Sequence, residues 1–229
     1  MYILAFDTTA AQCSIVLQKD NTIISSFREY MNFGQSEVLI PQMENMLKSN
    51  NLSFADINMV LVCVGPGSFT GVRAGIAVAR TFQLVRSDLL LDGVSSFEAY
   101  VLSLLPEERG EINAVIIETK RDDFYIQLFD KNLQKITPPQ ALVYDDIIPL
   151  LRHKKISMVG DGVERFLSRN SGLSLHCIKM PDGLEVTDMI KAGLNHLAEG
   201  KLDYPKPLYL RAPDVSTPKS TVQSGVFSA

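Results

Sequence analysis

The sequence contains little cysteine and little histidine, and both are widely spaced. The three cysteines are Cys13, Cys63 and Cys177. An odd number of distant cysteines, two of them inside apolar runs, is typical of reduced, buried thiols in a cytoplasmic protein. The three histidines, His153, His176 and His196, lack the H-x-x-x-H and H-E-x-x-H spacings. The usual zinc-hydrolase ligands are therefore missing, and we expect no metal site.

A large excess of charge and a long hydrophobic run are missing too. The chain has 22 lysines and arginines against 26 acidic residues, a net charge of −4. Such a mild balance argues against a large basic face for nucleic acid. No apolar run approaches the ~18 residues of a transmembrane helix. The segment from Met1 to Asp7 has no basic n-region, so we interpret it as a strand and expect a cytoplasmic protein with no role at a membrane.

What the chain does contain is enough apolar sequence for a folded core. Its 229 residues are 46% hydrophobic, which is typical of globular proteins. Two blocks each begin with a strand hairpin and continue as mixed α and β sequence. We therefore predict an α/β protein of two domains, 1–105 and 106–211, with the last helix, about 185–199, a candidate to pack on the first domain. Residues 212–229 are rich in serine and threonine and are expected to form a mobile tail.

The hydrophobic pattern places the secondary structure coarsely. In the helix expected after Gly34, Pro41 should lie near the start or mark a kink. Ser95 or Ser96 can cap a later helix. The expected strands are 2–6, 14–17, 22–27, 59–64, 89–91, 113–117, 124–129 and 156–159. The expected helices are 34–50, 71–86, 96–104, 145–151, one from 163, and 185–198.

A glycine-rich segment, Gly65 to Gly71, lies between a buried strand and a helix, where backbone amides can cradle an anion. It has no lysine, so it is not a Walker loop. It also departs from the dinucleotide fingerprint, because its third glycine comes one residue late and Pro66 removes a donor. Two interpretations remain: a tight turn with Ser68 as helix cap, or direct contact with a nucleotide.

The helix after this segment has small residues, Gly71, Gly75 and Ala79, at four-residue spacing. Such a ridge lets another helix approach closely. Apolar residues surround most of this helix and widen the stripe of the preceding one, so we infer that the pair presents a surface to another chain; the alternative is that both are sandwiched inside the fold. We expect this interface, exposed in an isolated chain, to contain Leu39, Ile40, Met43, Met46, Leu47, Phe69, Val72, Arg73, Ile76 and Arg80.

These segments resemble the TsaB (YeaZ) family. The resemblance is carried by I-L-A-F-D-T-T at residues 3–9 and by G-P-G-S-F-T-G-V-R-A-G at residues 65–75. It continues over most of the chain, outside the tail. The further matching segments are Ser36-Glu37, Leu39-Ile40-Pro41, Gly93-Val94-Ser95-Ser96 and Pro207-Leu208-Tyr209-Leu210-Arg211.

The resemblance implies an ASKHA fold (that of actin, Hsp70 and sugar kinases) of two RNase-H-like domains. It also implies a non-catalytic partner of the paralogue TsaD. With the P-loop ATPase TsaE, the two install threonylcarbamoyl on adenosine 37 of tRNAs that read codons beginning with A. In the family the two helices join TsaB to TsaD, or TsaB to itself when TsaD is absent. We expect tRNA to be bound only through the complex and no cofactor to be bound tightly; ATP or ADP at the interface with the partner stays open.

The residues agree with a non-catalytic role. An active ASKHA ATPase has glycines in the turn between its first two strands, whereas the turn after Asp7 has none. Asp7 stands where a metal-water carboxylate would sit; the alternative is a hydrogen-bonded structural residue. The metal-binding histidine pair of the paralogue is missing, and Gln35 stands where the family often has a histidine. The candidate nucleotide-proximal residues are Asp7, Thr8, Gly65, Gly67 and Ser68.

Two further points of the sequence allow more than one interpretation. The family tends to show D-A-R-x-x-E-V-Y in the second block, and this chain departs from it conservatively at Glu118, Lys120 and Asp123. This segment is either a solvated charged hairpin or a polar rim that faces the interdomain cleft or a partner. The alternative function is a nucleotide-hydrolysing or peptidase-like enzyme of the same fold. Binding of tRNA by this chain alone is disfavoured, because the net charge is negative and the basic residues do not cluster with aromatic ones.

Overall fold

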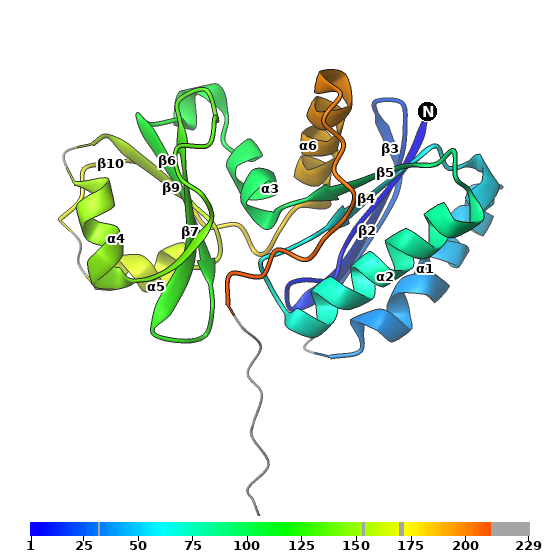
Figure 1. Cartoon of the computed structure of the whole chain (residues 1–229), viewed down its shortest axis with the longest axis horizontal. Coiled ribbons are helices and arrows are strands. Elements are labelled where there is room, and N and C mark those ends of the chain that lie inside the picture. The colour runs from blue at the N-terminus through cyan, green and yellow to red at the C-terminus, as the bar shows by residue number, and fades with distance from the viewer. Residues whose placement is uncertain (32, 153, 170–171, 212–229) are drawn as a thin grey trace, which may run out of the picture.

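The protein consists of two α/β lobes side by side, each built on a five-stranded sheet (Figure 1). The computed structural model describes residues 1–31, 33–152, 154–169 and 172–211; the tail predicted at 212–229 lies outside them. Both sheets mix parallel and antiparallel neighbours, in the orders β3-β2-β1-β4-β5 and β10-β9-β6-β7-β8. The predicted class, α/β with a mixed sheet and helices in each half, is confirmed.

The first sheet is covered by helices on both faces, as the unbroken apolar runs in its central strands require. Helices α1 and α2 pack on one face, and α3 and α6 on the other (Figure 1). The strands are β1 (Tyr2–Asp7), β2 (Gln12–Lys19), β3 (Thr22–Tyr30), β4 (Met59–Cys63) and β5 (Leu90–Val94). The helices are α1 (Gln35–Ser49), α2 (Phe69–Val85), α3 (Ser96–Leu102) and α6 (Val186–Glu199), with a 3₁₀ turn at Phe54–Asp56.

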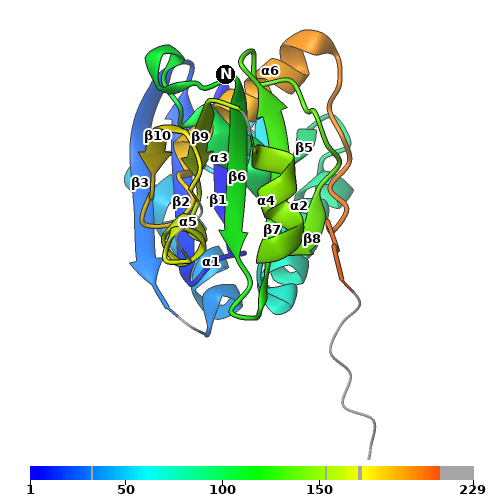
Figure 2. The same cartoon turned by 90° about the vertical axis from the view of Figure 1, so that its left-hand side faces the viewer.

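The second sheet carries smaller helices, α4 and α5, on its outer face (Figure 2). Strands β8 and β10 at its two edges were not predicted, because they are short and their side chains are partly exposed. The strands are β6 (Ile112–Glu118), β7 (Asp123–Asp130), β8 (Gln140–Val143), β9 (Ile156–Val159) and β10 (Leu175–Lys179). The helices are α4 (Tyr144–Leu151) and α5 (Val163–Leu167), with a 3₁₀ turn at Pro106–Glu108.

One continuous apolar core joins the lobes. It contains side chains from β1, β4, α3 and α6 together with Val115, Phe129 and Val159 of the second sheet. Helix α6 follows the second sheet in sequence yet packs on the first, where Gly193 lies so close to Leu61 of β4 that a Cβ would collide. Among the helices of the described residues, none is long and apolar enough to cross a membrane.

After α6 the chain runs back across the first lobe as an extended segment, residues 201–211, which we call the strap (Figure 1). Gly200 ends α6 in the left-handed conformation, at φ 66°. The strap is fixed by backbone hydrogen bonds from Gly93 N to Asp203 O, at 3.0 Å, and from Leu208 N to Val64 O, at 2.8 Å. At its end Arg211 pairs with Asp123 of the second lobe, so the strap contacts both lobes.

Two local features refine the sequence prediction. Ser95 caps α3 in a capping box with Glu98, as one of the two predicted serines should. Pro41 lies inside α1, in its second turn, and not at the start. Its ring is exposed, so proline occurs on the side of the helix that does not contact the sheet.

Candidate functional site

A cleft of about 340 Å³ opens between the lobes at the end of β1. It is formed by the β1–β2 turn, the glycine-rich segment, α3 and the β6–β7 turn. Of the candidate nucleotide-proximal residues, Gly67 and Ser68 line it, whereas Asp7 and Thr8 lie beneath its wall. The polar side chains that line the cleft belong to Thr9, Gln35, Ser68, Ser96, Tyr100, Glu118, Thr119, Lys120, Tyr125 and Asp161.

Asp7 holds the β1–β2 turn in place. Its carboxylate is fully buried and accepts hydrogen bonds from the backbone N of Thr9, at 2.8 Å, and from Thr9 Oγ1, at 2.7 Å. Burial raises the pKa of Asp7, and the two bonds from Thr9 oppose that rise. The second oxygen, Oδ2, has no hydrogen-bond partner among the described residues. One half of the carboxylate is therefore structural and the other half is unpaired.

The glycines after β4 accommodate this turn. A Cβ on Gly67 would collide with the carbonyl of Thr9, and one on Gly71 with the carbonyl of Thr8. Ser68 N donates to Thr9 O at 2.7 Å, and Ser68 Oγ accepts from Gly71 N at 3.3 Å. These two amides are thus used within the chain. The structure has the tight turn with Ser68 as cap, and contact of Gly65, Gly67 and Ser68 with a nucleotide stays a prediction.

Two acidic side chains, Glu118 and Asp161, lie on the far wall of the cleft. Burial raises the pKa of Asp161, and the neighbouring carboxylates of Glu118 and Asp7 raise it further. Burial also acts to raise the pKa of Glu118, but a pair of bonds from Arg165, at 2.7 and 2.8 Å, brings it below its ordinary value. Two alternatives were predicted for the β6–β7 hairpin, a solvated hairpin and a cleft rim. The structure has the second, because Glu118 and Lys120 line the cleft.

These residues alone do not fit a nucleoside triphosphate. A triphosphate needs amides and cations, whereas the wall presents carboxylates, and Lys120 is the one cationic side chain among the described lining residues. The unpaired Oδ2 of Asp7 adds a further carboxyl oxygen below the wall, and not a cation. Within the described residues no group of three or more histidine, cysteine or acidic side chains could hold a metal ion.

A buried polar chain ties the strand ends together beneath the cleft. Cys63 Sγ lies 3.4 Å from Thr9 Oγ1 and 3.2 Å from Ser96 Oγ, and Ser96 donates to Pro66 O at 3.0 Å. Burial raises the pKa of Cys63 to about 12, so the thiol stays protonated and unreactive. Cys13 is buried as well, as predicted, while Cys177 is only half-buried.

The expectation that the predicted interface residues are exposed in the isolated chain is wrong for six of the ten. Their side chains pack on Leu4, Phe6 and Val62 of the first sheet, because two helices must cover this face of the sheet. Gly75 likewise faces Thr8 and Val62, so the small residues let α2 approach its own sheet and not a second chain. The six buried residues are Leu39, Met43, Met46, Leu47, Val72 and Ile76.

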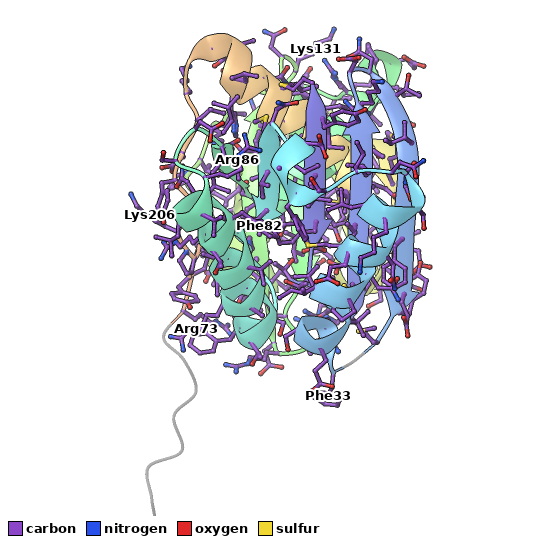
Figure 3. All side chains as sticks on the ribbon, turned by 90° about the vertical axis from the view of Figure 1, so that its right-hand side faces the viewer. Phe33, Arg73, Phe82, Arg86, Lys131 and Lys206 are labelled. Atoms are coloured by element: carbon purple, nitrogen blue, oxygen red, sulfur yellow. The ribbon has the colours of Figure 1, made fainter. Side chains whose placement is uncertain are left out.

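An apolar surface does remain on the outer side of α1 and α2. Leu84 is 85% exposed, Val85 80% and Ile40 44%, and Phe33 just before α1 is 90% exposed. Figure 3 views the molecule from the side of these two helices, with Phe33 protruding at one end. We call this surface the helical face; it contains Phe33, Ile40, Ala74, Ala77, Val78, Leu84 and Val85. Leu84 and Val85 were not among the predicted interface residues. The feature that could have indicated them is an apolar pair in the last turn of α2, beyond the residues that α2 buries on the sheet.

The remaining three predicted residues contact the strap. Arg73 Nε donates to Tyr209 Oη at 2.8 Å, and the rings of Phe69 and Tyr209 are stacked with centroids 5.1 Å apart. Arg80 donates from Nε and Nη2 to Pro205 O, at 3.1 and 2.5 Å. Sequence reasoning missed these contacts because the strap has no periodic pattern.

Comparisons with known proteins agree with this architecture. A family model described as TsaD, tRNA N6-adenosine threonylcarbamoyltransferase, matches residues 34–160. A relative from Buchnera aphidicola subsp. Schizaphis graminum, named tRNA threonylcarbamoyladenosine biosynthesis protein TsaB, is 32% identical over 74% of this chain and 82% of its own length. The protein of that name from Bacillus subtilis is 28% identical over 86% of this chain and 82% of its own.

The fold has a solved counterpart. The structure described as YeaZ from Pseudomonas aeruginosa superposes with a TM-score of 0.78, at 18% identity, over 91% of this chain and 99% of that one. At that identity the likeness concerns the fold. The family model spans more than half of the chain, and the relatives cover most of it. The chain therefore belongs to the TsaD domain family and, within it, to the TsaB (YeaZ) proteins of tRNA threonylcarbamoyladenosine biosynthesis.

Proposed function

We propose that this protein is a non-catalytic subunit of the assembly that transfers threonylcarbamoyl to adenosine 37 of tRNAs reading codons that begin with A. It acts by pairing with a TsaD-like paralogue through the helical face. The observation that carries the proposal is the exposure of Leu84, Val85 and Ile40 on the outer side of α1 and α2. Large apolar side chains that are left exposed on the outside of a lobe are typical of a surface that another chain covers.

The composition of α2 supports a protein partner. Its 17 residues contain no acidic side chain. The side of α2 that faces away from the sheet includes alanines, valines and a leucine. Small residues such as Ala74 and Ala77 let a facing helix come close. A second copy of the chain can use the same face when the paralogue is absent, which is the proposed reason for a homodimer.

The cleft supports a role without chemistry of its own. Its wall carries Glu118 and Asp161 in place of phosphate-binding amides and cations. In the proposed assembly no cofactor is bound tightly by this chain, and ATP or ADP lies at the interface only where the partner adds the missing cations. A TsaE-like P-loop ATPase is the third component, tRNA engages the assembled complex, and the complex works in the cytoplasm.

A charge on the helical face tests the pairing. Leu84→Glu should weaken binding to the TsaD-like paralogue at least about tenfold, because it buries a carboxylate in an apolar contact. Leu150→Glu is the matched control: Leu150 is also an exposed leucine on a helix, in the second lobe, and is 42% exposed. Binding is measured by calorimetry and the fold by circular dichroism. Unchanged pairing of Leu84→Glu would assign the contact to another surface.

One observation favours the alternative, a nucleotide-hydrolysing enzyme. The unpaired oxygen of Asp7 lies beneath the cleft wall and could hold a cation through water. Purified chain incubated with ATP and Mg²⁺ in the absence of any partner distinguishes the two functions. Turnover that Asp7→Asn abolishes would establish the enzyme, whereas the proposed function expects none above background.

A further inference from the structure

Cationic and aromatic side chains that are far apart in the sequence meet along one side of α2. They come from the strap and from the residues of α2 that contact it. We call this group the strap surface; it contains Phe69, Arg73, Arg80, Tyr204, Lys206 and Tyr209. Figure 3 shows Arg73 and Lys206 on the side of α2 away from α1, so the group borders the helical face without being part of it.

The rings and the cations alternate. The guanidinium of Arg73 lies 3.8 Å from the ring centroid of Phe69 and 5.8 Å from that of Tyr209. The guanidinium of Arg80 lies 4.8 Å from the ring centroid of Tyr204. Tyr204 is 44% exposed and Tyr209 42%, and Arg73 and Lys206 are exposed as well. The strap thus orders large flat groups at the surface next to fixed positive charge.

The charge of this region is opposite to that of the chain. Together α2 and the strap hold five cationic residues and one acidic residue, Asp203, in a protein of net charge −4. Two of the five are neutralised, Lys201 by Glu199 and Arg211 by Asp123. Arg73, Arg80 and Lys206 form no ion pair with any described residue. Their charge is therefore available to an anionic ligand.

We propose that the strap surface binds single-stranded RNA. Tyrosine rings and a planar guanidinium are platforms on which unpaired bases stack, and lysine and arginine neutralise the phosphates between them. The inference deepens the proposed function, on which it rests for the origin of the RNA: an unpaired segment of the tRNA that the complex modifies. It also revises the sequence-based expectation that basic and aromatic residues do not cluster, since folding brings residues 69–80 and 204–209 together.

The test measures binding of the full chain to a fluorescein-labelled single-stranded RNA of about 12 nucleotides by fluorescence anisotropy over a salt series. Replacing Arg73 and Lys206 together by glutamine should weaken binding at least about tenfold at low salt and reduce the slope of log K against log salt by about 1.4. Tyr209→Leu should weaken binding about fivefold with no change of slope. Duplex RNA of the same sequence should bind less tightly than the single strand.

Lys131→Gln is the matched control, because it removes one exposed lysine at the far end of the molecule (Figure 3). It should change affinity less than about twofold. Absence of binding by the unaltered chain, an equal effect of Lys131→Gln and Lys206→Gln, or no effect of Tyr209→Leu would each overturn the inference. All variants are checked for unchanged melting temperature.

Pairing with the TsaD-like paralogue is measured on the same variants. If Arg73→Gln and Lys206→Gln weaken pairing and leave RNA binding intact, the strap surface belongs to the protein interface and the inference is wrong. Leu84→Glu separates the two proposals from the other side: it should lose pairing and still bind the RNA. RNA binding by Leu84→Glu is expected whether or not the paralogue pairs through the helical face. Failure of the pairing proposal therefore leaves the RNA proposal standing, and the reverse also holds.

Discussion

The two lobes cover the outer faces of their sheets with helices of very different size. In the first lobe α1 and α2 have 15 and 17 residues, whereas in the second α4 and α5 have 8 and 5. Both pairs bury an apolar cluster against a five-stranded sheet. The shorter pair shows how little helix a sheet of this width needs. The longer helices of the first lobe bury one side on the sheet and present a longer outer side, which contains the helical face.

The comparison also separates two roles within α2. The side toward the sheet is as buried as any core strand, with Val72 2% and Ile76 3% exposed. The opposite side leaves Leu84 and Val85 in solvent. Substitutions on the two sides should therefore differ in kind: one set changes the free energy of unfolding, and the other changes association.

The largest effect is expected for Ile76→Glu. A carboxylate at this position would be buried against the first sheet without a partner, so we expect a loss of roughly 4 kcal/mol or more in the free energy of unfolding. Urea unfolding followed by circular dichroism measures it. Ala77→Glu, one residue further and exposed, should stay within about 0.5 kcal/mol. Equal stability of both variants would show that α2 does not pack on the sheet through Ile76.

Gly71→Ala should destabilise the protein by roughly 2 kcal/mol, although alanine is the better helix former by ~1 kcal/mol. The added methyl group would collide with the carbonyl of Thr8, which is backbone and cannot move aside. The same unfolding assay reports the change. A more stable Gly71→Ala protein would mean that the β1–β2 turn does not press on α2.

The link between α6 and the first lobe should depend on pH. His196 Nδ1 lies 2.7 Å from Asp92 and Nε2 3.3 Å from Glu98, and these two hydrogen bonds raise the pKa of His196 to about 10. Because the folded value lies above the unfolded one of ~6.5, this stabilisation is complete below about pH 6.5 and is lost as the pH rises toward 10.

We expect the contacts of His196 with Asp92 and Glu98 to contribute roughly 2 kcal/mol to the free energy of unfolding. Urea unfolding at a series of pH values from 6 to 10 measures the loss, and His196→Asn should flatten the profile. His176→Asn in the second lobe is the control, since the ring of His176 forms no ion pair with any described residue and lies 2.9 Å from a backbone carbonyl, Glu107 O. An unchanged profile for His196→Asn would contradict the assignment.

The smallest effect is expected for Leu84→Ser. The side chain is 85% exposed and loses no contact with the core on truncation, so the free energy of unfolding should stay within about 0.5 kcal/mol. Thermal melting of the isolated chain measures it. A clear loss of stability would mean that Leu84 is covered within the protomer and would remove it from the helical face.

Much of the fold could be predicted from sequence because its strongest signals are local. The apolar runs at residues 2–6 and 59–64 predicted the central strands. Ser68 was one of two interpretations of the glycine-rich turn and Ser95 one of two candidate caps, and the structure has both as caps. Strand β10 could not be found in this way, since its side chains alternate between half-buried and exposed and none is fully buried. Such an edge strand obtains its conformation from pairing with a neighbouring strand, here β9, and not from its own sequence pattern.

The site could be predicted only in part, for a geometric reason. A helical period identifies which residues share a face, but not which of two apolar faces meets the sheet. Val72 and Ile76 were therefore assigned to the partner side, although they belong to the core. The strap contains Pro205 and Pro207 and has no period at all, so nothing in the sequence placed Tyr209 beside Arg73.

Helix α6 has a consequence for how the chain is made. Its residues Val186, Met189 and Ile190 complete the core on the inner face of the first sheet, whose strands are all synthesised before residue 95. On the ribosome, that face of the sheet stays only partly covered, by α3, until residues 186–199 have emerged. Residues 1–105 alone therefore cannot form a finished lobe, and a chain that stops before Val186 leaves an apolar face of the first sheet partly open, which quality control can recognise.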